Sequence, residues 1–415
     1  MLTAAGSLCC SGAAAAKISR QKKAYRAIGV GRQGNFMSEE RKGLPLETGQ
    51  SESIRPVLIA SKQAAGEHSI FLHHLLVGLA DESIPVALVC RPGCDVNSIV
   101  SPLVKVIRHP AFNLPLLWRQ NRRILVERLG KFRPTVLHCL CRSEAPLAGQ
   151  LARQLDLPCV LTVNSLQKRL GRLSISSRHL AKIIVPAKSI ATDIAEVYPK
   201  FSGRVEQINI GTFVEEKSGC FGELGRLASM VTAHPLRNAG DFENLLRAAR
   251  HLAIDGYEFM LVVTGGGRAE RQLRKLSVEL ELSQIVLIVP RLKPWRSVLS
   301  AGDIFIQPVV SSAFNPLLLE AMSVGTAVAA CKGGVDDLII EGKTAVVFDP
   351  DDELSIYNCL RQLFDRREFA RQLARGAQQY LRENYSVSKM ISSTLQIYRD
   401  AQQEFKVSRP GWPWY

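Results

Sequence analysis

The chain has 415 residues, 46% of them hydrophobic, which is enough for two domains with substantial cores. Its net charge of +15 indicates attraction to anions, but the basic residues are spread out without aromatic interleaving, which argues against nucleic-acid binding. Ten cysteines without a CxxC pair favour reduced thiols and argue against zinc. No apolar run reaches about 18 residues, so no membrane-spanning helix is predicted.

The N-terminal segment, residues 1–55, is predicted to be a disordered basic tail or a mis-assigned start, with translation beginning at Met37. It is apolar before it is basic, which is the reverse of a secretory signal. The expected location is therefore cytoplasmic. Because the chain is basic, a peripheral contact with an anionic surface on the cytoplasmic membrane face stays open.

From Pro56 onward, short apolar runs alternate with helical patterns, which is typical of βαβ units and parallel sheets. In the first half, strands are predicted at 56–61, 85–90, 104–108, 135–140, 159–164, 182–186 and 205–209. The second half repeats the rhythm, with strands at 227–232, 259–264, 284–289, 303–308, 326–330 and 344–348. Apolar residues at helical spacing predict helices between them, and two or three more after Pro350.

This pattern predicts an α/β fold of two doubly wound, Rossmann-like domains that face each other across a cleft. The expected boundaries are an N-terminal domain at 56–214, a linker at 215–225, a C-terminal domain at 226–395, and a helix end with a tail at 396–415. Open parallel sheets bind ligands at the carboxyl ends of their strands, so the site is expected in the cleft.

The stretch from residue 311 to 352 contains the densest set of candidate groups. Asn315 is suited to cap a helix and Pro316 to be its first residue, which would leave the amides of Leu317 and Leu318 facing an anion. Glu320 follows one turn later among apolar neighbours. A carboxylate there needs a partner, and a ligand hydroxyl is one candidate.

This stretch resembles the donor-binding signature of the retaining glycosyltransferases of family 4. The family pattern E-x-F-G-x-x-x-x-E-A-M-A-x-G-x-P-V appears here as S-A-F-N-P-L-L-L-E-A-M-S-V-G-T-A-V, followed by Gly333-Gly334. The second family glutamate is Glu320, whereas Ser312 occupies the place of the first. The resemblance spans roughly residues 56 to 400 and implies the GT-B fold, an acceptor domain first, and a C-terminal domain that holds a nucleotide-diphosphate sugar.

The resemblance implies three residues at the reaction centre: Asn164, Ser312 and Glu320. The family glutamate at 320 accepts hydrogen bonds from the donor ribose, and that at 312 contacts the transferred sugar. At 164 the family often has a histidine that orients this sugar. Two interpretations stay open for His138 in the strand before it, a family motif position or a satisfied histidine at a strand end.

The resemblance also implies a set of donor-binding positions. His234 and Ala239 stand where the family has an arginine and a lysine that neutralise the diphosphate, so this charge pair is missing. Arg237, Arg268 and Arg291 are candidate replacements. The full set is Gly66, His234, Arg237, Gly265, Gly266, Arg268, Arg291, Leu292, Phe314, Asn315, Leu317, Glu320 and Gly333.

Several of these positions have a plain structural alternative. Gly265 and Gly266 follow a strand, and Gly66 follows another, so each run could simply be a tight turn. Trp295 packs either on a base or in the core. Asp349 and Asp351 spell a D-x-D pattern, but a turn and helix cap is expected, with no metal.

The leading hypothesis is a metal-independent hexosyltransferase-type enzyme. It would transfer a sugar, with retention, from a nucleotide sugar to a glycan, lipid-linked or small-molecule acceptor, as in polysaccharide biosynthesis, with no cofactor and no nucleic-acid partner. The alternative is a catalytically silent GT-B protein that binds a nucleotide, a glycan or a partner transferase. Four altered positions favour it: Asn164, His234, Ala239 and Ser312.

Overall fold

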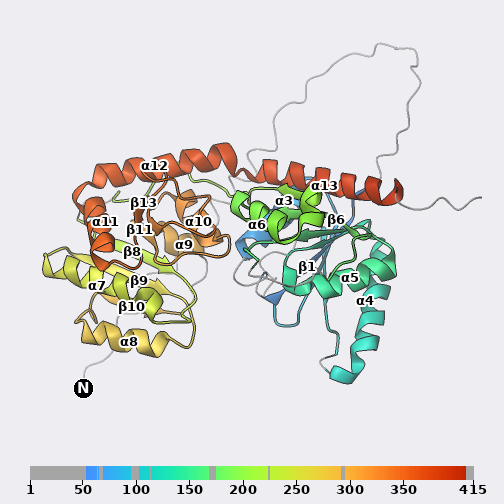
Figure 1. Ribbon diagram of the computed structural model, residues 1–415, viewed down its shortest axis with the longest axis horizontal. Helices are drawn as coiled ribbons and strands as arrows, with labels where there is room; N and C mark the ends of the chain where they lie inside the picture. Colours follow the sequence, from blue (N-terminus) through green and yellow to red (C-terminus); the bar gives the residue numbers. More distant parts are fainter. Residues whose placement is uncertain are drawn as a thin grey trace, which may run out of the picture. The chain divides into compact units, whose positions relative to one another are not determined.

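The two series of apolar runs form two parallel β-sheets, each flanked by helices (Figure 1). The computed structural model describes residues 53–62, 64, 69–94, 102–112, 114–167, 174–222, 225–290 and 295–407. The predicted N-terminal tail up to residue 52, and the chain end from residue 408, lie outside the described residues.

The first sheet has seven parallel strands, in the order β3-β2-β1-β4-β5-β6-β7. In chain order they are β1 (Pro56–Ala60), β2 (Val86–Cys90), β3 (Val104–Arg108), β4 (Val136–Cys139), β5 (Cys159–Thr162), β6 (Leu180–Val185) and β7 (Val205–Gln207). The helices are α3 (Ser69–Asp81), α4 (Trp118–Phe132), α5 (Ala145–Leu155) and α6 (Lys188–Val197), with short 3-10 helices η2 (Pro115–Leu117), η3 (Arg142–Glu144) and η4 (Pro199–Arg204). The central strands are buried on both faces, as their continuous apolar runs predict.

The second sheet has six parallel strands, in the order β10-β9-β8-β11-β12-β13. They are β8 (Ala228–Ala233), β9 (Phe259–Thr264), β10 (Val286–Val289), β11 (Ile304–Gln307), β12 (Ala327–Cys331) and β13 (Val346–Phe348). Its helices are α7 (Gly240–Ile254), α8 (Glu270–Glu279), α9 (Trp295–Ser300), α10 (Pro316–Val324), α11 (Glu353–Asp365) and α12 (Arg367–Asn384). Every predicted strand is confirmed, with no end displaced by more than two residues.

Both sheets reverse their strand order at the centre, between β1 and β4 and between β8 and β11. Neighbouring connections leave in opposite directions there, which opens a crevice at the carboxyl ends of the strands. The predicted α/β fold of two Rossmann-like domains is therefore confirmed.

The last helix, α13 (Val387–Val407), returns to the first domain. Met390, Ile391 and Tyr398 lie in the same buried cluster as Leu72 of α3. The expected boundary between residues 395 and 396 thus falls inside one helix, whose whole inner face packs on the first domain. None of the described helices combines the length and apolarity needed to cross a bilayer.

The two chain crossings between the domains lie side by side. Thr212, in the segment after β7, bridges to Ser386, and its amide donates to the Tyr385 carbonyl over 2.9 Å. A Cβ on Gly211 would stand 2.5 Å from the Val387 Cα, so only glycine permits this approach. Thr212 also contacts the buried carboxylate of Glu320 in α10.

Candidate functional site

A cavity of about 400 Å³ opens at the carboxyl ends of β8, β9 and β11, at the crevice of the second sheet. We call it the second-domain cavity. Its wall includes His234 after β8, Thr264 at the end of β9, Gln307 at the end of β11, and residues 309–317 leading into α10. Six positions predicted from the sequence line it: His234, Arg237, Ser312, Phe314, Asn315 and Leu317.

The start of α10 forms one wall of this cavity. The Asn315 side chain caps the helix as predicted, accepting hydrogen bonds from the amides of Leu317 over 3.0 Å and Leu318 over 3.3 Å. The expectation that these amides are free to face an anion was therefore wrong, because the cap itself occupies them. Leu317 lines the cavity, but its amide is already satisfied.

Charged groups of both signs stand at the cavity rim. Arg237 is exposed, and Asp241 from the first turn of α7 lines the same cavity. Burial lowers the pKa of His234, although the nearby Asp241 opposes this shift. The imidazole is consequently neutral near pH 7, so it can donate or accept a hydrogen bond, while Arg237 supplies the positive charge.

Gln307 is a cavity residue that the sequence analysis missed. It is only 4% exposed, and its Oε1 accepts a hydrogen bond from Asn315 Nδ2 over 3.0 Å. Its Nε2 is buried and has no hydrogen-bond partner among the described residues. A buried donor left unpaired costs free energy unless a ligand or water satisfies it. The available signal was a polar residue ending the apolar run Ile304–Gln307.

The glycine loop after β9 supports this cavity and does not line it. A Cβ on Gly265 would stand 2.2 Å from the His234 carbonyl oxygen, while Gly266 accepts a hydrogen bond from the Leu236 amide. Arg268 Nε donates to the Arg237 carbonyl over 3.1 Å. The structure thus places these three predicted donor residues behind the loop of His234 and Arg237, where they position it.

Ser312 and Asn164 are brought together through their backbones. The Leu166 amide donates to the Ser312 carbonyl over 2.8 Å, and the Phe314 amide donates to the Asn164 carbonyl over 2.9 Å. The loop after β5 therefore pairs with the loop before α10, around an antiparallel bridge between Ser165 and Ala313. The Asn164 side chain lines a separate small cavity with His138, and its Oδ1 has no partner among the described residues.

The loop that contains Gly333 contacts the segment before α10 on its other side. Gly333 donates its amide to Asp336 Oδ2 over 2.9 Å, and Gly334 bridges to Ser311. Both glycines have positive φ, and a Cβ on Gly334 would stand 2.2 Å from the Ser311 carbonyl oxygen. These glycines are needed for backbone geometry, and neither lines the second-domain cavity.

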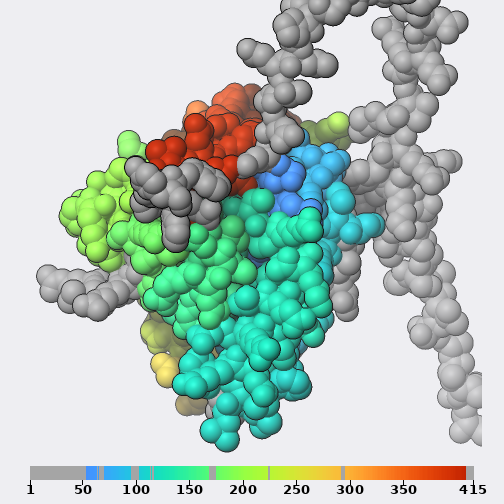
Figure 2. Space-filling view, turned by 90° about the vertical axis from the view of Figure 1, so that its right-hand side faces the viewer, coloured from blue at the N-terminus to red at the C-terminus, as the bar shows by residue number. Residues whose placement is uncertain are grey.

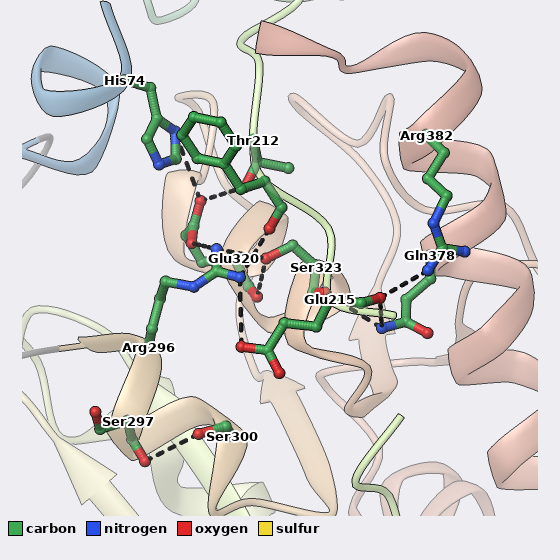
Figure 3. Close-up of polar contacts among 11 residues, drawn as sticks. His74, Thr212, Glu215, Arg296, Ser297, Ser300, Glu320, Ser323, Gln378 and Arg382 are labelled. Atoms are coloured by element: carbon green, nitrogen blue, oxygen red, sulfur yellow. Dashed lines mark hydrogen bonds and ion pairs between the residues drawn. The ribbon is translucent and has the colours of Figure 1, made fainter. Parts of the chain in front are cut away.

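Glu320 is not among the residues that line the second-domain cavity. Its polar contacts are drawn in Figure 3. Its side chain is 0% exposed, with Oε1 accepting from the Thr212 hydroxyl over 2.6 Å and Oε2 from Arg296 Nη1 over 2.7 Å. Arg296 also donates to the Phe213 carbonyl, over 2.7 Å. The buried carboxylate does have the partners it requires, and the interdomain segment and α9 supply them.

Comparison with known proteins assigns both halves of the chain. A family model for "Glycosyltransferase Family 4" matches residues 69–213, and one for "Glycosyl transferases group 1" matches residues 228–380. The chain belongs to the GT-B glycosyltransferases.

Related sequences match only in part. Sulfoquinovosyl transferase SQD2 of Arabidopsis thaliana is 36% identical over 84 residues, which are 19% of this chain and 16% of the relative. A D-inositol 3-phosphate glycosyltransferase of Corynebacterium urealyticum is 24% identical over 248 residues, 52% of this chain and 56% of the relative. The matches thus span about half or less of these relatives' lengths.

Solved structures share the fold over nearly their whole length. A glycosyltransferase from Rickettsia africae superposes with a TM-score of 0.70 at 14% identity, covering 84% of this chain and 99% of that one. HepE from Anabaena, solved in complex with UDP-glucose, gives a TM-score of 0.66 at 14% identity, covering 83% and 99%. At this identity the likeness establishes the GT-B architecture.

The first GT-B domain has a cavity of its own, of about 510 Å³. We call it the first-domain cavity. It lies at the carboxyl ends of β1, β2 and β4, where Arg91 Nη2 stands 3.1 Å from Glu144 Oε1. Its outer wall contains Phe112, Leu114 and Trp118. The sequence analysis named no residue in this cavity.

The structure also places most of the other residues that the sequence analysis singled out. His138 is the satisfied histidine, with Nδ1 2.7 Å from the Tyr398 hydroxyl and Nε2 2.7 Å from the Thr162 hydroxyl. Asp349 forms the expected turn, accepting from the Asp351 amide, and Asp352 caps α11. Trp295 is buried in the core while also lining the second-domain cavity. Gly66, Arg291 and Leu292 lie outside the described residues.

Proposed function

We propose that the protein is a glycosyltransferase that takes a sugar from a nucleotide diphosphate held in the second-domain cavity. The observation that supports this most is the convergence of Arg237, neutral His234 and the unpaired Gln307 Nε2 on a cavity at the β8/β11 crevice. A cation and neutral donors suit a diphosphate and sugar hydroxyls respectively. HepE, which shares the fold, binds UDP-glucose.

The proposed transfer proceeds with retention and without a metal or other cofactor. The anomeric configuration of the sugar is retained when the acceptor enters on the face from which the diphosphate leaves. The departing diphosphate can then itself take the acceptor proton. No strong protein base is then required, which suits the Ser312 hydroxyl and the Asn164 amide at positions where the family has a carboxylate and an imidazole. The protein contributes alignment and stabilisation of the leaving charge.

The acceptor is proposed to enter the first-domain cavity, which lies at the equivalent edge of the other sheet. Hexosyl transfer to a glycan, a lipid-linked sugar or a small molecule fits a cavity of about 510 Å³ with polar and aromatic walls. A cytoplasmic location supplies the nucleotide sugar. Nucleic acid is not a proposed partner.

The proposal is tested by calorimetric titration of the full chain with UDP, GDP and ADP and their sugar derivatives. Arg237→Ala should weaken diphosphate binding by about tenfold or more, because a hydrogen bond to a charged group contributes about 1.5–3 kcal/mol. Gln307→Leu should weaken sugar-nucleotide binding, and it also removes the acceptor of the Asn315 Nδ2 hydrogen bond. Arg271→Ala, an exposed arginine on α8 outside the cavity, is the matched control.

Turnover separates the proposal from a second candidate, a silent nucleotide-binding protein. That candidate is favoured by Ala239, which is buried in the core at the place of the family lysine. Release of diphosphate that EDTA leaves unchanged, with the anomeric configuration of the product retained, supports the transferase. Binding without turnover supports the silent protein, and absence of binding at millimolar nucleotide overturns both.

A further inference from the structure

The segment between β3 and α4 exposes an unusual density of large apolar side chains. Phe112, Leu114, Leu116 and Trp118 are all exposed, Leu116 to 93% and Trp118 to 53%. They belong to one stretch that enters α4 through the short helix η2. Scattered exposed apolar residues are ordinary, but a contiguous group of this size indicates a contact surface.

This exposure is fixed by the structure. Asn121 of α4 is buried and binds the Phe112 backbone twice, accepting from its amide and donating to its carbonyl, each over 2.8 Å. Leu125, Leu129 and Phe132 lie on the same face of α4 as Trp118, further along the helix, and are buried in the core. These three residues fix how the helix lies on the core, and Trp118, at the start of the same face, is left 53% exposed.

The same helix presents a strongly basic outer face. Its sequence contains Arg119, Arg122, Arg123, Arg128 and Lys131 against a single acid, Glu127, which is 3.0 Å from Lys131 Nζ. The guanidinium carbons of Arg119 and Arg122 lie over the Trp118 ring, 5.3 and 4.9 Å from its centroid. The apolar side chains are thus bordered directly by arginines.

We name the group Phe112, Leu114, Leu116, Trp118, Arg119 and Arg123 the apolar-basic surface. It belongs to the turquoise part of the chain that forms the lower end of the face in Figure 2. Phe112, Leu114 and Trp118 also form the rim of the first-domain cavity. An amphipathic molecule whose apolar part contacts this surface would have its polar head next to the first-domain cavity.

We propose that the apolar-basic surface docks on an anionic lipid bilayer. Phe112, Leu114, Leu116 and Trp118 enter the interface between headgroups and acyl chains, and the arginines of α4 bind the lipid phosphates. Apolar insertion combined with basic residues is the combination that gives firm contact with an anionic membrane surface. The contact is made by the segment before α4 and by the start of that helix, because the rest of the apolar face of α4 is already occupied by the core.

A second copy of the chain is the less suitable occupant. A symmetric contact places each surface against itself, which would bring the arginines of α4 against their own copies. An anionic bilayer satisfies the charge and the apolar side chains together. The docking does not depend on the proposed glycosyl transfer, and the vesicle assay below needs neither donor nor acceptor.

The test is flotation of the full chain with vesicles of phosphatidylcholine alone or with about 30% phosphatidylglycerol. We expect binding at least tenfold stronger to the anionic vesicles, and weaker binding at high salt. The net charge of +15 would itself give some salt-sensitive attraction, so the variants decide the matter. Leu116→Glu should reduce binding at least tenfold, and Arg119→Glu with Arg123→Glu should do the same.

The matched controls are Val278→Glu and Arg271→Glu, at exposed positions of α8 on the second domain. They should retain binding. Leu116 is nearly free of contacts, so its variant is expected to fold, and an unchanged melting temperature checks this. Equal loss in variants and controls, or no preference for anionic vesicles, overturns the proposal. A wild-type dimer that Leu116→Glu converts to a monomer also overturns it, in favour of a second copy.

Discussion

Glu320 has strong hydrogen-bond partners inside the chain. Thr212 and Arg296 each donate to one carboxylate oxygen, and the His74 Nδ1 stands 4.0 Å from Oε1. The His74 imidazole donates to the Gly211 carbonyl, and burial lowers its pKa, although Glu320 opposes this shift. His74 is therefore neutral near pH 7, and Arg296 provides the charge that compensates the carboxylate.

The first prediction concerns this carboxylate. Glu320→Ala should lower the free energy of unfolding by about 3 kcal/mol, the lower end for a broken buried pair, because Arg296 is 32% exposed and partly solvated. Glu320→Gln should cost less, since it can still accept from Thr212. Urea unfolding of both variants measures this, with the exposed Glu341→Ala as control, expected within about 0.5 kcal/mol of wild type. Unchanged stability with lost nucleotide affinity would instead make Glu320 a ligand contact.

Asn315 and Gln307 differ in how far the sequence could predict them. The Asn-Pro pair specifies a helix start through contacts within three residues, so the cap was predictable. Gln307 acquires its unpaired Nε2 from the packing around β11, which no local pattern describes.

At the scale of elements, the strands were predictable because each is a run of apolar residues between helical patterns. The clearest displaced end is that of β5, predicted to reach residue 164 but ending at Thr162. There the chain leaves the sheet so that Asn164 and Leu166 can pair with residues 312 and 314 of the second domain. A distant backbone partner ended the strand.

The second prediction concerns the crossing of α3 and α13. A Cβ on Gly78 would stand 2.3 Å from Ile391 Cγ1, so Gly78→Ala forces the isoleucine to move. We expect destabilisation of about 1–3 kcal/mol from overpacking, despite the better helix propensity of alanine. Gly130→Ala in α4, where nothing lies within 4 Å of the new Cβ, is the control and should be neutral or stabilising.

A double variant checks the cause of this effect. If the collision with Ile391 is responsible, Gly78→Ala combined with Ile391→Ala should be more stable than the sum of the two single effects. Simple additivity would mean that another contact is responsible.

At the scale of the whole molecule, buried histidines connect stability to pH. Burial lowers the pKa of the buried or half-buried histidines His74, His109, His138, His179 and His234. The largest resolved shift is at His138, whose pKa falls to about 3 between β4 and α13. Since unfolding exposes these groups, the unfolded chain binds protons first as the pH falls.

The third prediction is that the protein loses stability as the pH falls, because the unfolded chain binds protons first. The free energy of unfolding should have its full value above about pH 6.5 and decline below it. Between about pH 6.5 and 3, His138 alone should lower it by about 1.4 kcal/mol for each pH unit. His138→Gln, which does not titrate but can still hydrogen-bond Tyr398, should show a shallower decline. Urea unfolding at a series of pH values measures both slopes, and identical slopes would contradict the assignment to His138.

The sequence by itself determined the two α/β domains, the strand positions, the helices after Pro350 and the cap of α10. Each of these depends on periodic or adjacent residues, whose physics acts over a few positions. Only the tertiary structure decided the partners of Glu320, the pairing of Asn164 with Phe314, the unpaired Nε2 of Gln307 and the exposure of Phe112, Leu114, Leu116 and Trp118. Thr212 lies 108 residues from Glu320 along the chain, so only the folded packing brings these groups together.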